Sequence, residues 1–367
     1  MTADGVRVID RRTFSPVYEM GRLKKTLLVP IAYPLSLVYA AGVRLWRRRR
    51  VHAEDIGLPV VSVGSISVGG TGKTPLSMLI ASHLTSRGKK VAVVSRGYKR
   101  KGGPSPLVVS DYDGVRAGVE EAGDEPYLMA SRRTGVAVVI DSNRLRGAEY
   151  ARDALGPDVV LLDDGFQCRA IRKRLDIVTV GLDALAPGAA YLPWGPLREG
   201  LDAIGPEDLV VYVARSDIEK RVADGGGPGW PLAALKRRGD FYVGSYVDPV
   251  IVDAAGEAAG PAADLGRAVV VSGIARPEGF EATCDNLGIA AAAIIRFDDH
   301  HWYGGADRSM IEKVMEELGC EYIATTEKDL LRMPGPLRER ALAVRISMKV
   351  EGRDFLERVA ERVNAGE

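Results

Sequence analysis

The stretch PVVSVGSISVGGTGKTP, residues 59–75, is the most informative part of the chain. Its first part, 59–64, is short and rich in β-branched residues, and turn residues follow it, which indicates a buried strand. From Leu76 to Ser86, apolar residues recur with helical spacing. A strand, a glycine-rich loop and a helix in this order are the context that a nucleotide-binding P-loop requires.

The composition of this loop predicts how it would hold phosphate groups. Glycines let successive backbone N–H groups turn inward and form an anion nest, and the helix start adds its positive dipole end. Lys73 would reach the β- and γ-phosphates of ATP, and the Thr74 hydroxyl would ligate Mg²⁺. Ser67 stands where the usual pattern begins with Gly. The expected nucleotide contacts are Val68, Gly69, Gly70, Thr71, Gly72, Lys73, Thr74 and Pro75.

Two further predicted strands end in polar residues. The strand 91–94 leads into Ser-Arg-Gly-Tyr with Arg96, and the strand 158–162 leads into Asp163 and Asp164. Ligands bind outside the carboxyl ends of parallel strands, so Arg96 could hold a phosphate, or it is an ordinary surface arginine. The two carboxylates match a Walker B pattern that binds Mg²⁺ directly or through water, although an Asp-Asp-Gly turn has the same composition. Which aspartate faces the metal stays open.

The N-terminal region combines an apolar run with basic ends. Thr26–Val43 contains no charged residue, and lysines and arginines flank it on both sides. A spanning helix needs roughly 20 apolar residues, and Pro30 and Pro34 interrupt this shorter run. A cleaved signal peptide does not end in a block of arginines. We expect an interfacial helix on the anionic cytoplasmic leaflet; a spanning helix and a core helix with a solvated basic end are the alternatives.

Bulk composition narrows the possible classes of protein. The chain has 367 residues and a net charge of only +1, which does not suggest a nucleic-acid partner, but residues 1–50 contain eleven Lys or Arg and three Asp or Glu. Such a basic arm favours an anionic surface. The three cysteines are widely spaced and form no CxxC, so we expect neither a disulfide framework nor a zinc site, and a reducing compartment fits.

Several short motifs occur together in a specific order. They are SVGGTGKTP, Ser-Arg-Gly-Tyr, the Gly-Asp-Glu-Pro of 123–126, the Asp-Asp-Gly-Phe-Gln of 163–167, LPWGPLRE at 192–199 and the Asp-His-His of 299–301. Over about residues 27–335 the chain thereby resembles the tetraacyldisaccharide 4′-kinases. The resemblance implies transfer of the ATP γ-phosphate to the 4′-hydroxyl of a tetraacylated glucosamine disaccharide 1-phosphate, at a site between two domains. One departure is Cys168, where the family usually has His.

The resemblance also implies roles for individual residues. Asp124 would be the catalytic base, with His300 as its partner and His301 as the alternate or a substrate contact. Glu199 would lie near the metal, and Arg198 would contact phosphate or substrate. Taken from the residues alone, Gly123-Asp124-Glu125-Pro126 is more typical of a helix start, with Asp124 as cap and Pro126 in the first turn. The stretch that contains the histidine pair, 299–303, could alone be a metal-binding cluster or a polar loop.

The expected organisation has three parts. A membrane-associated helix at 20–50 precedes a P-loop NTPase-like α/β domain with a parallel sheet at 51–246, and a smaller α/β domain at 247–367 follows, beginning with a linker at 247–267. In this last part, strands at 268–271, 291–297 and 321–324 alternate with helices. We expect a monomer, monotopic on the cytoplasmic face of the inner membrane.

Other P-loop classes fit less well. A membrane-associated ATPase switch without a lipid acceptor is the main alternative, but Val68 occupies the position of that class's signature lysine. A GTPase would carry an Asn-Lys-x-Asp motif, and a Rossmann oxidoreductase would carry G-x-G-x-x-G after the first strand. Neither motif is present.

Overall fold

The computed structural model describes two compact units. The P-loop unit comprises Ser15–Tyr246 and Met348–Glu367, and the small unit comprises Met1–Phe14 and Val247–Ser347. The described residues are 6–13, 22–98, 100–132, 135–186, 189–216, 219–220, 223, 232, 235–352 and 354–365. Of the sequence features above, residues 20–21, the first two of the expected N-terminal helix, lie outside these ranges.

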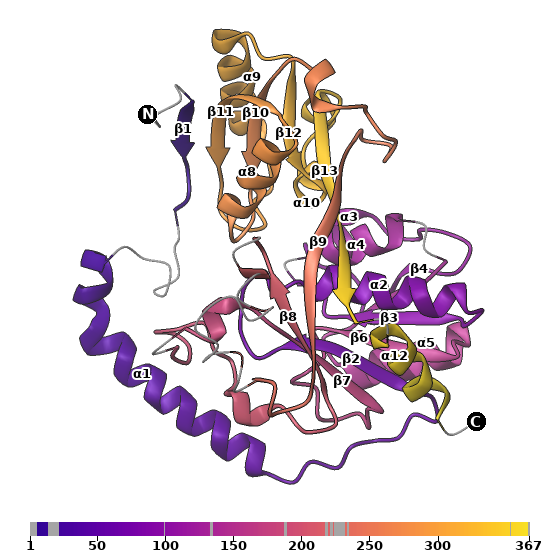
Figure 1. The fold of residues 1–367 in the computed structure, drawn as a ribbon. Helices are drawn as coiled ribbons and strands as arrows, with labels where there is room; N and C mark the ends of the chain where they lie inside the picture. Colours follow the sequence, from indigo (N-terminus) through magenta and orange to yellow (C-terminus); the bar gives the residue numbers. More distant parts are fainter. Residues whose placement is uncertain are drawn as a thin grey trace. The chain divides into compact units, whose positions relative to one another are not determined.

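The P-loop unit is built on a largely parallel sheet (Figure 1). Its strand order is β9-β8-β7-β2-β6-β3-β5-β4, and only β4 runs antiparallel to its neighbour among the described pairs. Central strands buried on both faces read as continuous apolar runs, as the sequence predicted for β2 and β6. The strands are β2 (Val60–Ser65), β3 (Val91–Ser95), β4 (Leu107–Ser110), β5 (Ala137–Ile140), β6 (Val159–Asp163), β7 (Leu175–Val180), β8 (Leu209–Ala214) and β9 (Asp240–Val252).

Helices cover both faces of this sheet. On one face α2 (Lys73–Ser86), α4 (Asp124–Ser131) and α12 (Phe355–Asn364) share a core with β2, β3 and β5. On the other face α5 (Arg144–Leu155) packs on alternate residues of the same strands. Short helices complete the unit: α3 (Val119–Ala122), η1 (Leu182–Ala184) and η2 (Leu201–Ala203). The predicted P-loop α/β architecture is confirmed.

The small unit is a second α/β unit with a parallel sheet of order β1-β11-β10-β12-β13. Its strands are β1 (Arg7–Asp10), β10 (Arg267–Ser272), β11 (Ala290–Arg296), β12 (Tyr322–Thr326) and β13 (Ala341–Glu351). Its helices are η3 (Ala262–Asp264), α8 (Pro277–Asn286), α9 (Gly305–Leu318), α10 (Glu327–Arg332) and α11 (Gly335–Arg338). The expected alternation of strands and helices is present, and β1 adds an edge strand from the N-terminus that the sequence patterns did not indicate.

The chain passes between the units inside two strands. It leaves the P-loop unit within β9 and returns within β13, so that residues 348–367 belong to the P-loop unit. This differs from the linker and C-terminal domain expected at 247–267 and 247–367. The reason is apolar packing: α12 buries Phe355, Val359 and Val363 in the same core as α2.

The apolar N-terminal segment forms one long helix, α1 (Arg22–Arg48), which continues through Pro30 and Pro34. The sequence interpretation that these prolines interrupt it was wrong. Both prolines are exposed, so water can satisfy the carbonyl groups that lose a helical partner. The segment Leu28–Arg48 is long and apolar enough to cross a membrane, judged by length and composition only.

Candidate active site

The P-loop connects β2 to α2 in the conformation that its glycines permit. Gly69 and Gly72 have φ angles of 94° and 76°, in the left-handed region that favours glycine. Gly72 is the N-cap of α2, so the N–H groups of the first helical turn point into the loop. The loop is also pinned from outside, since the Val68 N–H donates to the Pro196 carbonyl at 2.9 Å. This arrangement can hold an anion.

Lys73 extends across the loop toward two oxygen groups. Its Nζ lies 3.4 Å from Thr71 Oγ1 and 3.8 Å from Asp164 Oδ1. Thr71 is buried, and its hydroxyl accepts a hydrogen bond from the Thr179 hydroxyl at 3.1 Å. Strand β7, which carries Thr179, thereby stabilises the loop. Thr74 is buried at the second position of α2. The structure thus brings together the predicted phosphate-binding lysine and a Walker B carboxylate.

The two Walker B aspartates have different surroundings. Asp163 ends β6 beside β2, is 2% exposed, and accepts a hydrogen bond from Ser77 Oγ at 2.8 Å. Burial, followed by the negative charges of Glu125 and Asp164, raises its pKa to about 7. Burial would also raise the pKa of Asp164, but Lys73 and Arg198 outweigh it, and the net pKa is lowered. Asp164 is therefore the ionised carboxylate of the pair, and it faces the positive side chains of Lys73 and Arg198.

Glu125 and Arg144 belong to this site, and the sequence interpretation missed both. Glu125 exerts the largest charge effect on Asp163. Arg144 is 5% exposed, and the charges of Arg96, Asp163 and Asp164 all act on its pKa. Burial, then Arg96, lowers the pKa of Arg144. Glu125 is the second residue of α4, and Arg144 begins α5 after the polar turn that follows β5. Recognising β5 before Asp-Ser-Asn-Arg (141–144) would have identified the arginine.

Arg96 follows strand β3, and Asp124 begins helix α4 in the same unit. Arg96 is exposed directly after β3. Asp124 is 4% exposed and is the first residue of α4, with Gly123 as the cap. The helix-start interpretation is confirmed in its position, but the capping residue is Gly123. The carboxylate of Asp124 accepts from the Glu125 N–H at 3.0 Å.

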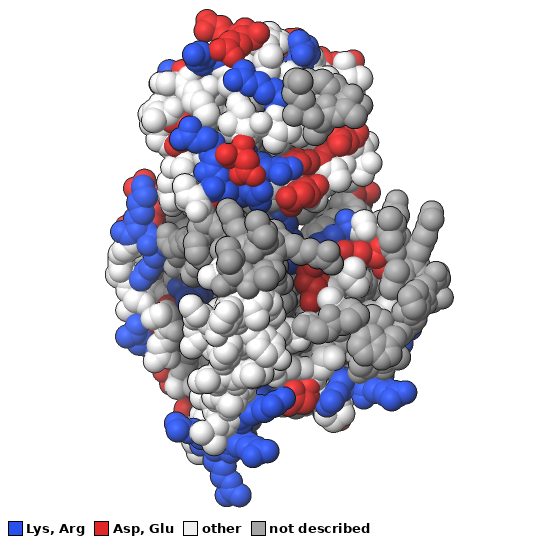
Figure 2. Space-filling model, turned by 90° about the vertical axis from the view of Figure 1, so that its left-hand side faces the viewer, with Lys and Arg blue, Asp and Glu red and all other residues white. Residues whose placement is uncertain are grey.

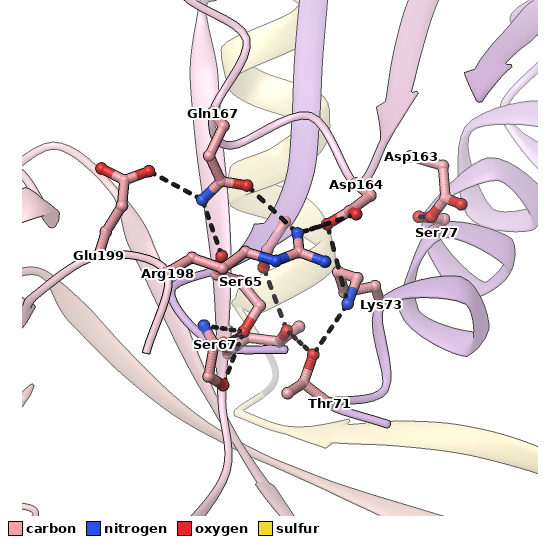
Figure 3. Close-up of polar contacts among 12 residues, drawn as sticks. Ser65, Ser67, Thr71, Lys73, Ser77, Asp163, Asp164, Gln167, Arg198 and Glu199 are labelled. Atoms are coloured by element: carbon pink, nitrogen blue, oxygen red, sulfur yellow. Dashed lines mark hydrogen bonds and ion pairs between the residues drawn. The ribbon is translucent and has the colours of Figure 1, made fainter. Parts of the chain in front are cut away.

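Arg198 and Glu199 reach the site from the loop that borders the P-loop. Both of their backbone N–H groups donate to the Ile66 carbonyl, at 2.8 and 3.0 Å. Arg198 Nη1 lies 3.0 Å from each carboxylate oxygen of Asp164, and Glu199 is 2% exposed and accepts from Gln167 Nε2 at 2.8 Å. Figure 3 shows Gln167 between Glu199 and Arg198. In this structure, Arg198, the expected phosphate contact, binds Asp164, and Glu199, the expected metal neighbour, binds Gln167.

The two histidines in the small unit have distinct environments. The His301 ring stacks on Phe297 with centroids 4.5 Å apart, and its Nε2 lies 3.0 Å from Asp307. His300 adopts a φ of 61° and its N–H donates to the Gly273 carbonyl at 3.0 Å. A non-glycine residue in this region is strained and is often found at functional sites. His301 is thus held by contacts within its own unit, and His300 Nε2 lies 3.7 Å from the Asp299 carboxylate.

A buried ion pair supports this histidine loop. Asp329 and Arg332, 0% and 3% exposed, are 2.7 Å apart. Asp329 accepts from the Gly273 N–H at 3.0 Å, and Arg332 donates to the Gly273 carbonyl at 3.0 Å. The pair therefore binds both the N–H and the carbonyl of Gly273, and the same carbonyl accepts from the His300 N–H. Thr326 is the N-cap of α10, and its side chain accepts from the Asp329 N–H.

Comparison with known proteins agrees with these features. The family model described as tetraacyldisaccharide-1-P 4′-kinase matches residues 25–364. A tetraacyldisaccharide 4′-kinase of Anaeromyxobacter sp. (strain K) is 36% identical, over 92% of this chain and 90% of that protein. One from Geobacter metallireducens is 34% identical, over 88% and 92%.

A crystal structure of LpxK from Aquifex aeolicus, in complex with ATP, is similar over the whole fold. It superposes with a TM-score of 0.72 and 29% identity, covering 93% of this chain and 99% of that one. The family model and the two relatives each match most of the chain. The chain belongs to the tetraacyldisaccharide-1-P 4′-kinase family.

Proposed function

We propose that this protein is an ATP-dependent kinase that transfers the γ-phosphate to the 4′-hydroxyl of a tetraacylated glucosamine disaccharide 1-phosphate. One observation carries the chemistry: the P-loop lysine Lys73 lies 3.8 Å from Asp164, the carboxylate at the tip of the neighbouring strand. Family membership supports the choice of acceptor. A membrane-associated ATPase switch shares the P-loop but would not account for the match along 25–364.

The oxygen donors at this edge of the sheet fit a hard divalent cation such as Mg²⁺. Burial and the neighbouring carboxylates of Glu125 and Asp164 raise the pKa of Asp163, and a bound cation would favour its ionised form. The chemistry that Mg²⁺ supplies when bound is neutralisation of charge on the transferring phosphate. The residues that would hold it are Thr74, Asp163, Asp164 and Glu199.

Positive side chains would position and stabilise the phosphates. Lys73 would contact the β- and γ-phosphates once it leaves Asp164, and Arg96 would approach from β3. Arg198, which holds Asp164 in this structure, would turn to phosphate or substrate as charge arrives. Because phosphoryl transfer has little covalent chemistry for the protein to perform, this positioning would supply most of the rate.

The acceptor hydroxyl needs a base. Asp124 would accept its proton, with His300 of the small unit orienting the carboxylate and sharing the proton, and His301 as a substrate contact. The proposal gains support from the strained backbone of His300 and from the burial of Asp124.

We further propose that α1 lies on the cytoplasmic leaflet of the inner membrane and that the protein is a monotopic monomer. Ala32, Ser36 and Ala40 form a buried stripe, and Ser36 Oγ donates to the Tyr191 carbonyl at 2.7 Å. The opposite side exposes Leu37 and Val38, among others. Figure 2 shows an extensive uncharged surface on this side of the molecule, with Lys and Arg side chains gathered at its lower end. A helix attached along its length suits the interface, where acylated sugars present their hydroxyls.

A phosphotransfer assay in detergent micelles tests the proposal. Purified protein receives labelled ATP, Mg²⁺ and the tetraacylated disaccharide 1-phosphate, with Lys73→Ala as control. Label on the lipid that disappears in the control supports the kinase. ATP hydrolysis without labelled lipid would support the ATPase switch instead.

A further inference from the structure

The apolar helix α1 reaches the nucleotide site through one arginine. Arg47 Nη1 donates to Glu199 Oε2, and Arg47 Nη2 donates to the Ala203 carbonyl at 2.9 Å. The same guanidinium lies 5.8 Å from the centre of the Phe166 ring. Arg47 thus has three partners in the P-loop unit, although in the sequence it is only the first of four consecutive arginines.

Glu199 depends on two protein groups for its position. Its Oε1 accepts from Gln167 Nε2 at 2.8 Å and its Oε2 from Arg47, while the side chain is 2% exposed. A buried carboxylate is costly unless it is paired and hydrogen-bonded. Arg47 supplies the positive charge that pairs with this carboxylate and orders it out of contact with water.

The contacts continue from Glu199 into the P-loop (Figure 3). Gln167 donates through the same Nε2 to the Ser65 carbonyl at 3.0 Å, which fixes the orientation of its amide. Its Oε1 then accepts from Arg198 Nη1 at 3.4 Å, and that atom lies 3.0 Å from both oxygens of Asp164. Two of the candidate metal ligands, Glu199 and Asp164, therefore share one polar network that begins on α1.

We propose that Arg47 is a positioning residue of the nucleotide site: together with Gln167 it holds Glu199 in the orientation from which this carboxylate serves a divalent cation bound with ATP. The inference rests on the proposed function, which places Glu199 at the metal. Groups that orient a metal ligand change metal affinity about 10- to 100-fold when removed. The helix that meets the membrane would in this way be an integral part of the nucleotide site.

The test measures metal affinity without turnover. Full-length protein, saturated with a non-hydrolysable ATP analogue, is titrated with Mn²⁺, and free Mn²⁺ is followed by electron paramagnetic resonance. Arg47→Ala should weaken Mn²⁺ binding about 10- to 100-fold, and Arg47→Lys, which keeps the charge but not the two-pronged contact, should fall between. Arg48→Ala is the matched control, since Arg48 is an exposed neighbour on the same helix turn, and it should leave Mn²⁺ affinity unchanged.

Other outcomes separate failure of this inference from failure of the proposed function. Glu199→Gln should weaken Mn²⁺ binding as much as Arg47→Ala does. If Glu199→Gln weakens it and Arg47→Ala matches the Arg48→Ala control, Arg47 has no positioning role and the inference is overturned. If Glu199→Gln has no effect, Glu199 does not serve the metal, and that part of the proposed function falls with the inference. Binding of each variant to anionic vesicles, measured in parallel, identifies an effect of Arg47 that arises only from membrane attachment.

Discussion

Asp163→Asn removes the charge of the buried carboxylate at the end of β6 while keeping its shape. The asparagine oxygen can still accept the hydrogen bond that Ser77 Oγ donates at 2.8 Å. In the folded wild type the pKa of Asp163 is raised from 3.8 to about 7, chiefly by burial. That rise corresponds to at most about 4 kcal/mol, at 1.36 kcal/mol for a tenfold change in proton affinity.

The sign of the effect follows from proton linkage. Between pH 3.8 and about 7 the folded state keeps a proton on Asp163 that the unfolded state releases. The free energy of unfolding contributed by this group therefore falls as pH rises through that window. The variant has no such proton, so Asp163→Asn should match the wild type near pH 4 and become more stable than it by about 2–4 kcal/mol at pH 8.

Urea unfolding of wild type and variant at pH 4, 5, 6, 7 and 8, without nucleotide or metal, measures this difference. Titrating groups that do not interact with Asp163 contribute equally to both proteins, so their effects cancel. Glu125→Gln is the matched control: it removes the largest charge effect on Asp163 and should shift the pH window downward. A stability difference that stays constant with pH would refute the reasoning, because it would mean that Asp163 is ionised throughout in the folded protein.

Three further predictions concern other parts of the molecule. Asp124→Asn should lower kcat about 10²- to 10⁴-fold with unchanged affinity for an ATP analogue; steady-state kinetics at the wild-type rate would exclude Asp124 as the base. Asp329→Asn leaves Arg332 buried without its counter-charge and should reduce the free energy of unfolding by about 3–5 kcal/mol; a loss below about 1 kcal/mol in urea titrations would show that the pair is not needed. Val38→Ser should weaken partition into anionic vesicles about tenfold, since Val38 is 69% exposed and its burial in lipid is worth about 1.5 kcal/mol; unchanged sedimentation with vesicles would place this side of α1 away from the membrane.

The sequence alone was sufficient to predict the features that depend on residues close together in the chain. Gly69, Gly72 and Lys73 identified the P-loop because its geometry follows from local backbone conformation and a helix start. The strand before Asp163 and Asp164 was evident because a strand buried on both faces must be apolar along its length. Ordered motifs with these local signals were enough to indicate the family.

Tertiary structure decided what depends on residues distant in the chain. Asp163 and Asp164 are adjacent and identical in type, yet burial raises the pKa of one while Lys73 and Arg198 lower that of the other. Arg47 cannot be told from the three arginines after it until the fold places it against Glu199, 152 positions away. Local pattern reports the conformation that a segment prefers, whereas charge, burial and hydrogen-bond partners are set by whichever segments the fold brings together.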